Sequence, residues 1–370
     1  MPRHISYGVI GCGMMGQEHL RNIALLENAS VAAIFEPDPA MRAIAASLAP
    51  DAVLADTLAE VVNNPAVDCL LVASPNQHHF AQLREIAALR TLPVLMEKPL
   101  FIEADEADAV RHFGGSLAAP VWVAMEYRYM PPVARFIREA KSVTGGIRML
   151  TIREHRYPFL DKVGAWNRFT RTSGGTFVEK CCHFFDLMRH ILQSEPVRIM
   201  ASAGQAVNHL DERYDGETPD IWDNGYVIAD FENGARAMLE LCMFADGSRY
   251  QEELCAVGPA GKIECLVPGP ARFWPDHLGP LPTPQLIVSP RRPDTPFTIE
   301  LPVDPALLAA GDHNGSTYYQ HKRFCAAVRG EGPVEVTLED GWRAVAMGMA
   351  AQRSAREGRA VPNPLDVPPA

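Results

Sequence analysis

The stretch YGVIGCGMMGQEHL, residues 7–20, places a G-x-G-x-x-G sequence directly behind a short apolar run. Gly11 permits a tight turn from strand to helix, Gly13 lets the backbone approach a pyrophosphate, and Gly16 lets the helix pack closely on its strand. The start of such a helix offers unpaired N–H groups and a positive dipole to phosphates. A glycine-rich turn alone is a weak signal. The stretch predicts dinucleotide binding because Glu36 ends a second apolar run about 20 residues after the last glycine.

The acid at position 36 bears on the choice of dinucleotide. A carboxylate at the end of the second strand accepts hydrogen bonds from ribose hydroxyls and repels a 2′-phosphate. The next residues are Pro37 and Asp38, and neither is a cation. We therefore expect NAD rather than NADP. The alternative is that Glu36 is a solvated acid in a turn.

The composition bounds the fold and the class of protein. With 370 residues, of which 47% are hydrophobic, the chain is long enough for two domains. The N-terminal sequence lacks a signal peptide and no apolar stretch is long enough to span a membrane, so we expect a cytoplasmic protein. The eight cysteines form no C-x-x-C pair and are expected to be reduced thiols. A net charge of −11 argues against partners such as nucleic acids or anionic membranes, and we expect no metal site.

Strand and helix patterns alternate over the first third of the chain. We expect strands at residues 5–10, 30–36, 52–55, 68–74, 93–97 and 120–125, and helices at 14–26, 39–48, 58–63, 77–89 and 104–113. This alternation predicts a doubly wound parallel sheet with ligands at the carboxyl ends of its strands. We assign residues 1–125 to an NAD-binding Rossmann domain.

Residues 126–370 have a different pattern, typical of an α+β domain for substrate binding and oligomerisation. Alternating runs predict a large, mostly antiparallel open sheet with strands at 148–155, 197–203, 226–231, 235–243 and 253–257, flanked by helices at 133–141 and 338–356. Helices should cover one face of this sheet. The proline-dense stretch Pro268–Pro305 is expected to be a surface excursion without a central strand or helix, which contacts another subunit or covers the mouth of the active site.

Three segments carry residues suited to chemistry. Ser74-Pro75-Asn76, followed by His79, comes after the fourth strand, where it would contact the nicotinamide half of the cofactor; the alternative is an ordinary turn capped by Asn76. Lys98 follows the fifth strand between Glu97 and Pro99, and would project into the ligand crevice. The third segment is residues 174–186. If it is helical, Glu179 and His183 share a face, so that the carboxylate can orient the imidazole. The alternative is a polar pair that is satisfied internally.

With these motifs the chain resembles the Gfo/Idh/MocA oxidoreductases along nearly its whole length. The matching residues are Gly11, Gly13, Gly16, Ser74, Pro75, Asn76, His79, Glu97, Lys98, Pro99, Tyr127-Arg128-Tyr129-x-Pro131, Gly174-Gly175, His183 and Glu339-Asp340-Gly341. One residue departs from the pattern: members commonly carry Asp where this chain has Glu179. The resemblance implies a Rossmann domain joined to an α/β domain with a large open sheet. It also implies homodimers or homotetramers built by sheet packing, and oxidation or reduction of sugars, inositols or related polyols.

The expected roles follow from these positions. His183 would be the general base, since the unperturbed pKa of imidazole, about 6.5, lies close to working pH. Lys98 would hold the reacting hydroxyl, and Glu179 would orient Lys98 or His183. The residues expected around NAD are Gly11, Gly13, Met14, Met15, Gly16, Glu36, Ser74, Pro75, Asn76, His79, Glu97, Lys98 and Trp166. The residues expected around the substrate are Tyr127, Arg128, Trp166, Asn167 and Asp186.

Two other functions fit the same sequence. A glycoside-processing enzyme could oxidise and re-reduce its substrate with tightly held NAD, and would show no net turnover of cofactor. An NAD-responsive binding protein could use the fold without catalysis. The presence of both Lys98 and His183 argues against this last function.

Overall fold

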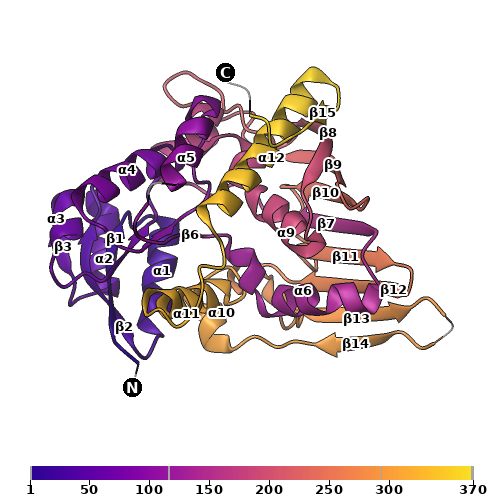
Figure 1. Ribbon diagram of the computed structural model, residues 1–370, viewed down its shortest axis with the longest axis horizontal. Coiled ribbons are helices and arrows are strands. Elements are labelled where there is room, and N and C mark those ends of the chain that lie inside the picture. The colour runs from indigo at the N-terminus through magenta and orange to yellow at the C-terminus, as the bar shows by residue number, and fades with distance from the viewer. Residues whose placement is uncertain (1, 116, 293, 368–370) are drawn as a thin grey trace.

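The computed structural model describes residues 2–115, 117–292 and 294–367, which form two sheets with helices between and around them (Figure 1). The first sheet has six parallel strands in the order β3-β2-β1-β4-β5-β6. Its strands are β1 Ile5–Ile10, β2 Ala29–Phe35, β3 Val53–Ala55, β4 Cys69–Val72, β5 Val94–Met96 and β6 Val121–Val123. Its helices are α1 Met14–Ala24, α2 Pro39–Leu48, α3 Leu58–Asn63, α4 His79–Leu89 and α5 Ala107–Gly114, with 3₁₀ turns η1 Asn76–His78 and η2 Ala104–Glu106. The predicted doubly wound sheet is confirmed.

The order of this sheet reverses between its two central strands, β1 and β4. Both strands are covered on both faces, which explains their nearly uninterrupted apolar sequences. The loops that follow them touch: a Cβ atom added to Gly11, where φ is +87°, would lie 2.6 Å from the backbone nitrogen of Ser74. Only glycine permits both this backbone conformation and this approach. The glycine-rich turn therefore lies at the switch point, where doubly wound sheets bind ligands.

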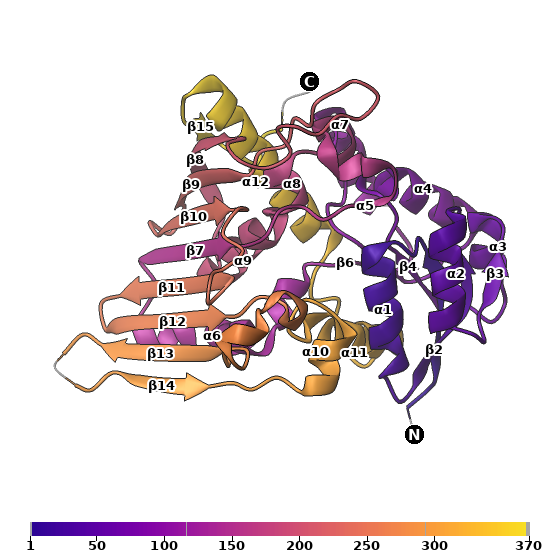
Figure 2. The same ribbon diagram turned by 180° about the vertical axis from the view of Figure 1, so that it is seen from behind.

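The second sheet has nine strands in the order β14-β13-β12-β11-β7-β10-β9-β8-β15 (Figure 2). All its neighbours are antiparallel except β7 and β10. Its strands are β7 Met149–His155, β8 Pro196–Gly204, β9 Asn224–Phe231, β10 Arg236–Cys242, β11 Glu252–Gly258, β12 Gly261–Val267, β13 Gln285–Pro290, β14 Phe297–Glu300 and β15 Val361–Pro362. The remaining helices are α6 Pro131–Thr144, α7 Thr170–Ser173, α8 Thr176–Glu179, α9 Cys182–Leu192, α10 Pro305–Ala310, α11 Ser316–Val328 and α12 Leu338–Glu357, with 3₁₀ turns η3 Glu126–Tyr129, η4 Val163–Arg168, η5 Ala271–Phe273 and η6 Asp276–Leu278. The predicted open, mostly antiparallel sheet is confirmed.

One face of the nine-stranded sheet is covered and the other is open. Helices α6, α9 and α12 lie on the covered face (Figure 1), where alternate residues such as Leu150 and Ile152 are buried. Residues that alternate with them point to the other face, and there Met149 is 58% exposed and Tyr226 56% exposed. Among the described helices, none covers this open face. The period-two pattern of the sequence is thus explained by one packed face and one free face.

Helices from the C-terminal end of the chain also pack on the nucleotide-binding half. Phe324 of α11 and Trp342 of α12 belong to the same apolar cluster as β1 and β5. Helix α11 contacts α1, and α12 contacts α5 and β6. The first sheet ends with β6 and the second begins with β7, and helices α11 and α12 pack between the two halves of the molecule. The boundary at residues 125 and 126 stays a prediction.

The expectation for Pro268–Pro305 was wrong in one respect. This stretch contains β13, which lies between β12 and β14 and buries Leu286 and Val288. Its prolines fall at the ends of the strand rather than inside the ladder, since Pro284 precedes it and Pro290 ends it, so the hydrogen bonds of the strand are not interrupted. Helix α10 likewise begins at a proline, where no N–H is needed. The part before β13 is irregular apart from two 3₁₀ turns, as expected.

The described helices include none with the length and apolar character that a membrane crossing requires. All eight cysteines are unpaired, as the sequence predicts.

Candidate active site

A cavity of about 590 Å³ opens at the switch point of the parallel sheet. The residues expected around the cofactor line it, with Gly16 as the exception. Gly16 instead packs against the glycine loop, where an added Cβ would lie 2.4 Å from the carbonyl oxygen of Gly11. An added Cβ on Gly13 would meet nothing within 4 Å, so this position is open to a ligand. No side chain caps the start of α1, which leaves its N–H groups free to bind a phosphate.

Glu36 is held by the loop that it faces. Its two carboxylate oxygens accept hydrogen bonds from the backbone N–H groups of Cys12, at 2.6 Å, and Asp38, at 2.8 Å. It is buried at the edge of the cavity rather than solvated in a turn. A carboxylate oxygen can accept more than one hydrogen bond, so Glu36 retains acceptor capacity for ribose hydroxyls.

The loop after β4 reaches across to the second half of the molecule. The side-chain amide of Asn76 donates to the backbone oxygen of Ser173 at 2.9 Å and to the carboxylate of Glu179. Asn76 therefore does not cap the helix that follows it. The ring nitrogens of His79 lie 2.7 Å from the carbonyl oxygen of Pro99 and 2.9 Å from that of Ser74. These contacts hold the loops after β4 and β5 together beneath the cavity.

Lys98 projects from the end of β5 toward Glu179. Its Nζ atom donates to the backbone oxygen of Glu179 at 2.9 Å and lies 4.0 Å from the carboxylate. Burial disfavours the charged form of Lys98, but the Glu179 carboxylate outweighs this and raises the pKa of Lys98. Burial also disfavours the charged form of Glu179 and by itself would raise the pKa of its carboxyl group. The charges of Lys98 and Lys162 outweigh burial and lower this pKa to about 2. The pair is therefore charged at neutral pH.

Lys162 and Trp166 close one side of the cavity. Lys162 Nζ lies 3.7 Å from the Glu179 carboxylate and 4.4 Å from the centre of the Trp166 ring. Both residues come from the loop and 3₁₀ turn between β7 and α7. Trp166 is an expected residue, whereas Lys162 is not, because it belongs to no motif in the sequence. Only the path of the chain after β7 brings it to Glu179.

Glu179 and His183 do not share one continuous helix. Glu179 ends α8 and His183 lies in the first turn of α9, with a break at residues 180 and 181. The Glu179 carboxylate lies near Asn76, Lys98 and Lys162. Glu179 therefore holds Lys98, through its backbone oxygen and the charge of its carboxylate, and makes no described contact with His183. The longer side chain of Glu179 reaches these partners without the shared helical face that the spacing predicted.

Tyr127 orients His183 by ring stacking. The two rings are parallel within 7° and their centroids lie 4.2 Å apart. The Tyr127 hydroxyl in turn contacts Lys180 Nζ at 2.5 Å, and Lys180 pairs with Glu154 at 2.8 Å. His183 Nδ1 has no hydrogen-bond partner among the described residues. Burial, followed by the charges of Lys98 and Lys180, holds the pKa of His183 well below its usual range. The imidazole is therefore neutral at neutral pH.

The other expected substrate residues are engaged inside the protein. Arg128 forms a buried, two-pronged ion pair with Asp186 and donates to the backbone oxygen of Glu335 at 3.0 Å. The amide of Asn167 donates to the backbone oxygen of Leu160 at 2.9 Å, which leaves its Oδ1 atom without a partner among the described residues. The lining of the nucleotide cavity includes none of Arg128, Asn167 and Asp186, and Tyr127 and His183 also lie outside it.

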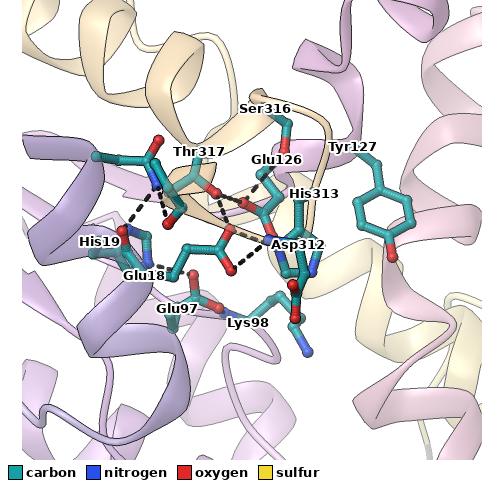
Figure 3. A network of polar contacts seen from close by, with 12 residues as sticks. Glu18, His19, Glu97, Lys98, Glu126, Tyr127, Asp312, His313, Ser316 and Thr317 are labelled. Carbon is teal, nitrogen blue, oxygen red and sulfur yellow. Dashed lines mark hydrogen bonds and ion pairs between the residues drawn. The ribbon is translucent and has the colours of Figure 1, made fainter. Parts of the chain in front are cut away.

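A polar cluster that the sequence did not predict lies beside Lys98 and Tyr127 (Figure 3). Glu18 of α1, Glu126 of η3 and His313 before α11 bring their polar atoms within 4.8 Å of one another. Such side chains can bind metal ions. Here, however, His313 Nδ1 lies 2.8 Å from Glu18, while the Thr317 hydroxyl lies within hydrogen-bonding distance of both carboxylates. The arrangement is therefore a hydrogen-bonded ion-pair cluster.

Comparison with known proteins gives the family context of this site. Residues 5–124 match the model of the Gfo/Idh/MocA oxidoreductase family for an NAD-binding Rossmann fold, and residues 141–363 match its C-terminal α/β domain. The chain is 32% identical to an inositol 2-dehydrogenase of Leifsonia xyli subsp. xyli over 272 residues, which are 73% of this chain and 75% of that protein. It is 25% identical to a myo-inositol 2-dehydrogenase of Thermotoga maritima over 364 residues, 96% of this chain and 97% of that protein. A levoglucosan dehydrogenase solved with NADH and levoglucosan has the same fold, with a TM-score of 0.80, 18% identity and coverage of 99% of this chain and 100% of that one.

Proposed function

The chain belongs to the Gfo/Idh/MocA family of NAD-binding oxidoreductases, and from this premise we propose that it oxidises a secondary hydroxyl of a sugar, an inositol or a related polyol. The observation that carries the proposal is that Lys98, which is cationic and lines the nucleotide cavity, lies close enough to His183 for its charge to help keep this imidazole neutral. The names of the relatives, inositol dehydrogenases and a levoglucosan dehydrogenase, support a polyhydroxylated substrate.

The roles of the side chains follow from their charges. NAD, when bound, supplies the acceptor for the hydride that leaves the carbon of the reacting alcohol. His183, neutral and oriented by Tyr127, accepts the proton of the hydroxyl as the carbonyl forms. Lys98 stabilises the negative charge that develops on the oxygen. Glu179 holds Lys98 in its charged form, and Asn76 and Lys162 hold Glu179.

We also propose that NAD is preferred over NADP. Glu36 and the neighbouring Asp38 border the cavity, so a 2′-phosphate at this place would face two acids. Like charges held close together cost several kcal/mol, on the order of 10²-fold in affinity. For the whole protein we propose a cytoplasmic location, which is consistent with its eight unpaired cysteines. We also propose a homo-oligomer that forms through the open face of the nine-stranded sheet.

A substrate screen tests the proposed reaction. Purified protein is mixed with NAD or NADP and with a panel of inositols, hexoses and anhydrosugars, and the absorbance of reduced nicotinamide is followed. The proposal expects reduction of NAD by at least one cyclic polyol and little activity with Lys98→Met. Product formation without any net reduced cofactor would instead indicate the transient redox cycle of a glycoside-processing enzyme. Tight polyol binding without any product would indicate a binding protein.

A further inference from the structure

His313 is fixed from one side by two acids that come from different parts of the chain. Its Nδ1 atom lies 2.8 Å from Glu18 and 3.6 Å from Glu126. The side chains of these two carboxylates are only 5% and 2% exposed. A buried carboxylate is stable only when it is paired and hydrogen-bonded, so this environment favours the imidazolium form of His313.

The hydrogen bonds of Thr317 define how protons are shared in the cluster. Its hydroxyl oxygen lies 2.9 Å from Glu18 and 2.6 Å from Glu126. A hydroxyl has a single hydrogen and can donate to only one of them. Thr317 therefore links the two acids unequally. Burial and the Glu18 charge raise the pKa of Glu126 against the opposing charge of His313, whereas His313 overcomes the effect of burial and lowers the pKa of Glu18 to about 2.

The charge of His313 is set by all the groups that face it. Burial disfavours its charged form, but Glu126 and Glu18 outweigh burial and raise its pKa to about 9, against the charge of Lys180. The other neighbours are the uncharged ring of Tyr127 and Asp312, which pairs with Arg272. His313 therefore carries two N–H donors throughout the neutral pH range.

The second nitrogen of His313 remains free for a ligand. Nδ1 faces Glu18, whereas Nε2 lies on the side of the ring toward Tyr127 (Figure 3) and has no hydrogen-bond partner among the described residues. The His313 side chain is 20% exposed, in contrast to the two acids behind it. The Nε2–H group of His313 thus faces accessible space, while the buried acids Glu18 and Glu126 lie on the Nδ1 side of the ring.

This free donor lies beside the reacting groups. The centre of the His313 ring is 6.0 Å from that of Tyr127, whose ring stacks on His183. Lys98 extends below His313 (Figure 3). His313 is also close enough to His183 for its charge to contribute to the low pKa of His183. A polyol held between Lys98 and His183 would present a second oxygen to His313.

We propose that His313 is a substrate-binding residue: its imidazole, held at Nδ1 by Glu18, donates its Nε2 hydrogen to an oxygen adjacent to the reacting hydroxyl. This inference rests on the proposed function and specifies part of its substrate. A donor that cannot become an acceptor selects an oxygen with a free lone pair, either a neighbouring hydroxyl or a carboxylate. Because both hydrogen-bonding partners would be charged, a carboxylate would bind more strongly than a hydroxyl.

The kinetic test compares two substitutions of His313 with a matched control. His313→Leu removes the donor, whereas His313→Gln keeps a neutral N–H donor. His112→Gln changes an exposed histidine of α5 and serves as the control. With the best polyol of the panel and saturating NAD, we expect His313→Leu to raise KM on the order of 10-fold or more, with a smaller change in kcat and unchanged NAD affinity. His313→Gln should restore part of the lost affinity. A folded His313→Leu variant with the KM of the wild type would overturn the inference.

Two further arms separate this inference from the proposed reaction. Glucose and glucuronate, compared as substrates or competitive inhibitors, distinguish a hydroxyl from a carboxylate at this position, and any preference for glucuronate should fall in His313→Leu. Histidine ring NMR of the NAD-loaded protein should show His313 protonated until about pH 9 and shifted by added myo-inositol or glucuronate. If the NMR signal of the His313 ring shifts with either compound but no polyol is oxidised, the inference is retained and the proposed reaction is rejected. The inference alone is rejected if His313 titrates at the ordinary pKa of histidine. It is also rejected if a polyol is oxidised while the NMR signal of the His313 ring responds to neither compound.

Discussion

The imidazole of His183 lies flat against the phenol ring of Tyr127, with ring centroids 4.2 Å apart and planes 7° apart. Because His183 Nδ1 has no hydrogen-bond partner among the described residues, this stacking is the main described contact that sets the orientation of the ring. We therefore expect Tyr127 to act on the reaction through His183, by means of its ring rather than its hydroxyl.

Substitution of Tyr127 separates these two parts of its side chain. We expect Tyr127→Phe to retain most of the activity, since Lys180 keeps its ion pair with Glu154. Tyr127→Ala should lower kcat about 10-fold or more, because the base is no longer held in position. Steady-state kinetics at saturating substrate measure the difference, with thermal melting to confirm that both variants fold. Equal losses in the two variants would show that the stacked ring is not what matters.

Glu36 should control the choice between NAD and NADP. The matched change is Glu36→Gln, which removes the charge and keeps one oxygen for the N–H of Cys12 or Asp38. We expect the ratio of kcat/KM for NAD to that for NADP to fall about 10-fold or more, since repulsion of the 2′-phosphate is relieved. Glu27→Gln, an exposed acid nearby in the sequence, is the control. A wild-type enzyme that uses NADP as well as NAD would contradict the assignment.

Lys98 and His183 should act on one proton-transfer step. Lys98→Met removes the cation beside the reacting oxygen and should lower kcat on the order of 10²-fold. When two groups serve one step, the double variant loses less than the product of the two single losses. Kinetics of Lys98→Met, His183→Ala and the double variant form the required cycle. Losses that simply multiply would place the two residues in separate steps.

The open face of the nine-stranded sheet should form the subunit contact. Tyr226 and Met149 expose more than half of their surface there, beside ion-paired side chains such as Arg153 and Glu240. None of the described helices covers this face, so it is free to pack on another subunit. We expect Tyr226→Asp to shift the protein toward monomer in light scattering. Leu89→Asp places the same charge on an exposed apolar residue of α4 and should leave the assembly unchanged. A wild-type protein that is monomeric at micromolar concentration would contradict the proposal.

The parts of the molecule that local patterns determine could be predicted from the sequence. Helices α2 and α3 and strand β1 have the predicted bounds, because capping residues such as Asp38 and Thr57 and uninterrupted apolar runs mark their ends. Strand β12 is not among the predicted strands, although its residues alternate between buried and half-buried positions in the same way as those of the predicted strands. Strand β13 could not be predicted from composition, because a proline-dense stretch argues against a central strand, whereas the prolines near β13 lie at the ends of the strand.

The site was predictable where a motif lies at the end of a strand. Lys98, Asn76 and Glu36 follow parallel strands, whose carboxyl ends meet at one edge of the sheet. Lys162 and His313 lie in loops with no such rule, and only the tertiary fold brings them to Glu179 and Glu18. The low pKa of His183 could not be read from its residue type, because it arises from burial and from cations that are distant in the sequence.

The pH dependence of His183→Ala tests the central claim most directly, namely that a neutral His183 accepts the proton of the substrate. Because the pKa of His183 is held well below its usual range, the neutral form predominates above that pKa. In the wild type, kcat/KM for oxidation should stay level near neutral pH and fall only as the pH drops through the lowered pKa. His183→Ala should lose this acid limb and on the order of 10²-fold or more in kcat, with nearly unchanged NAD affinity. A His183→Ala variant that kept the kcat and the pH profile of the wild type would contradict the account.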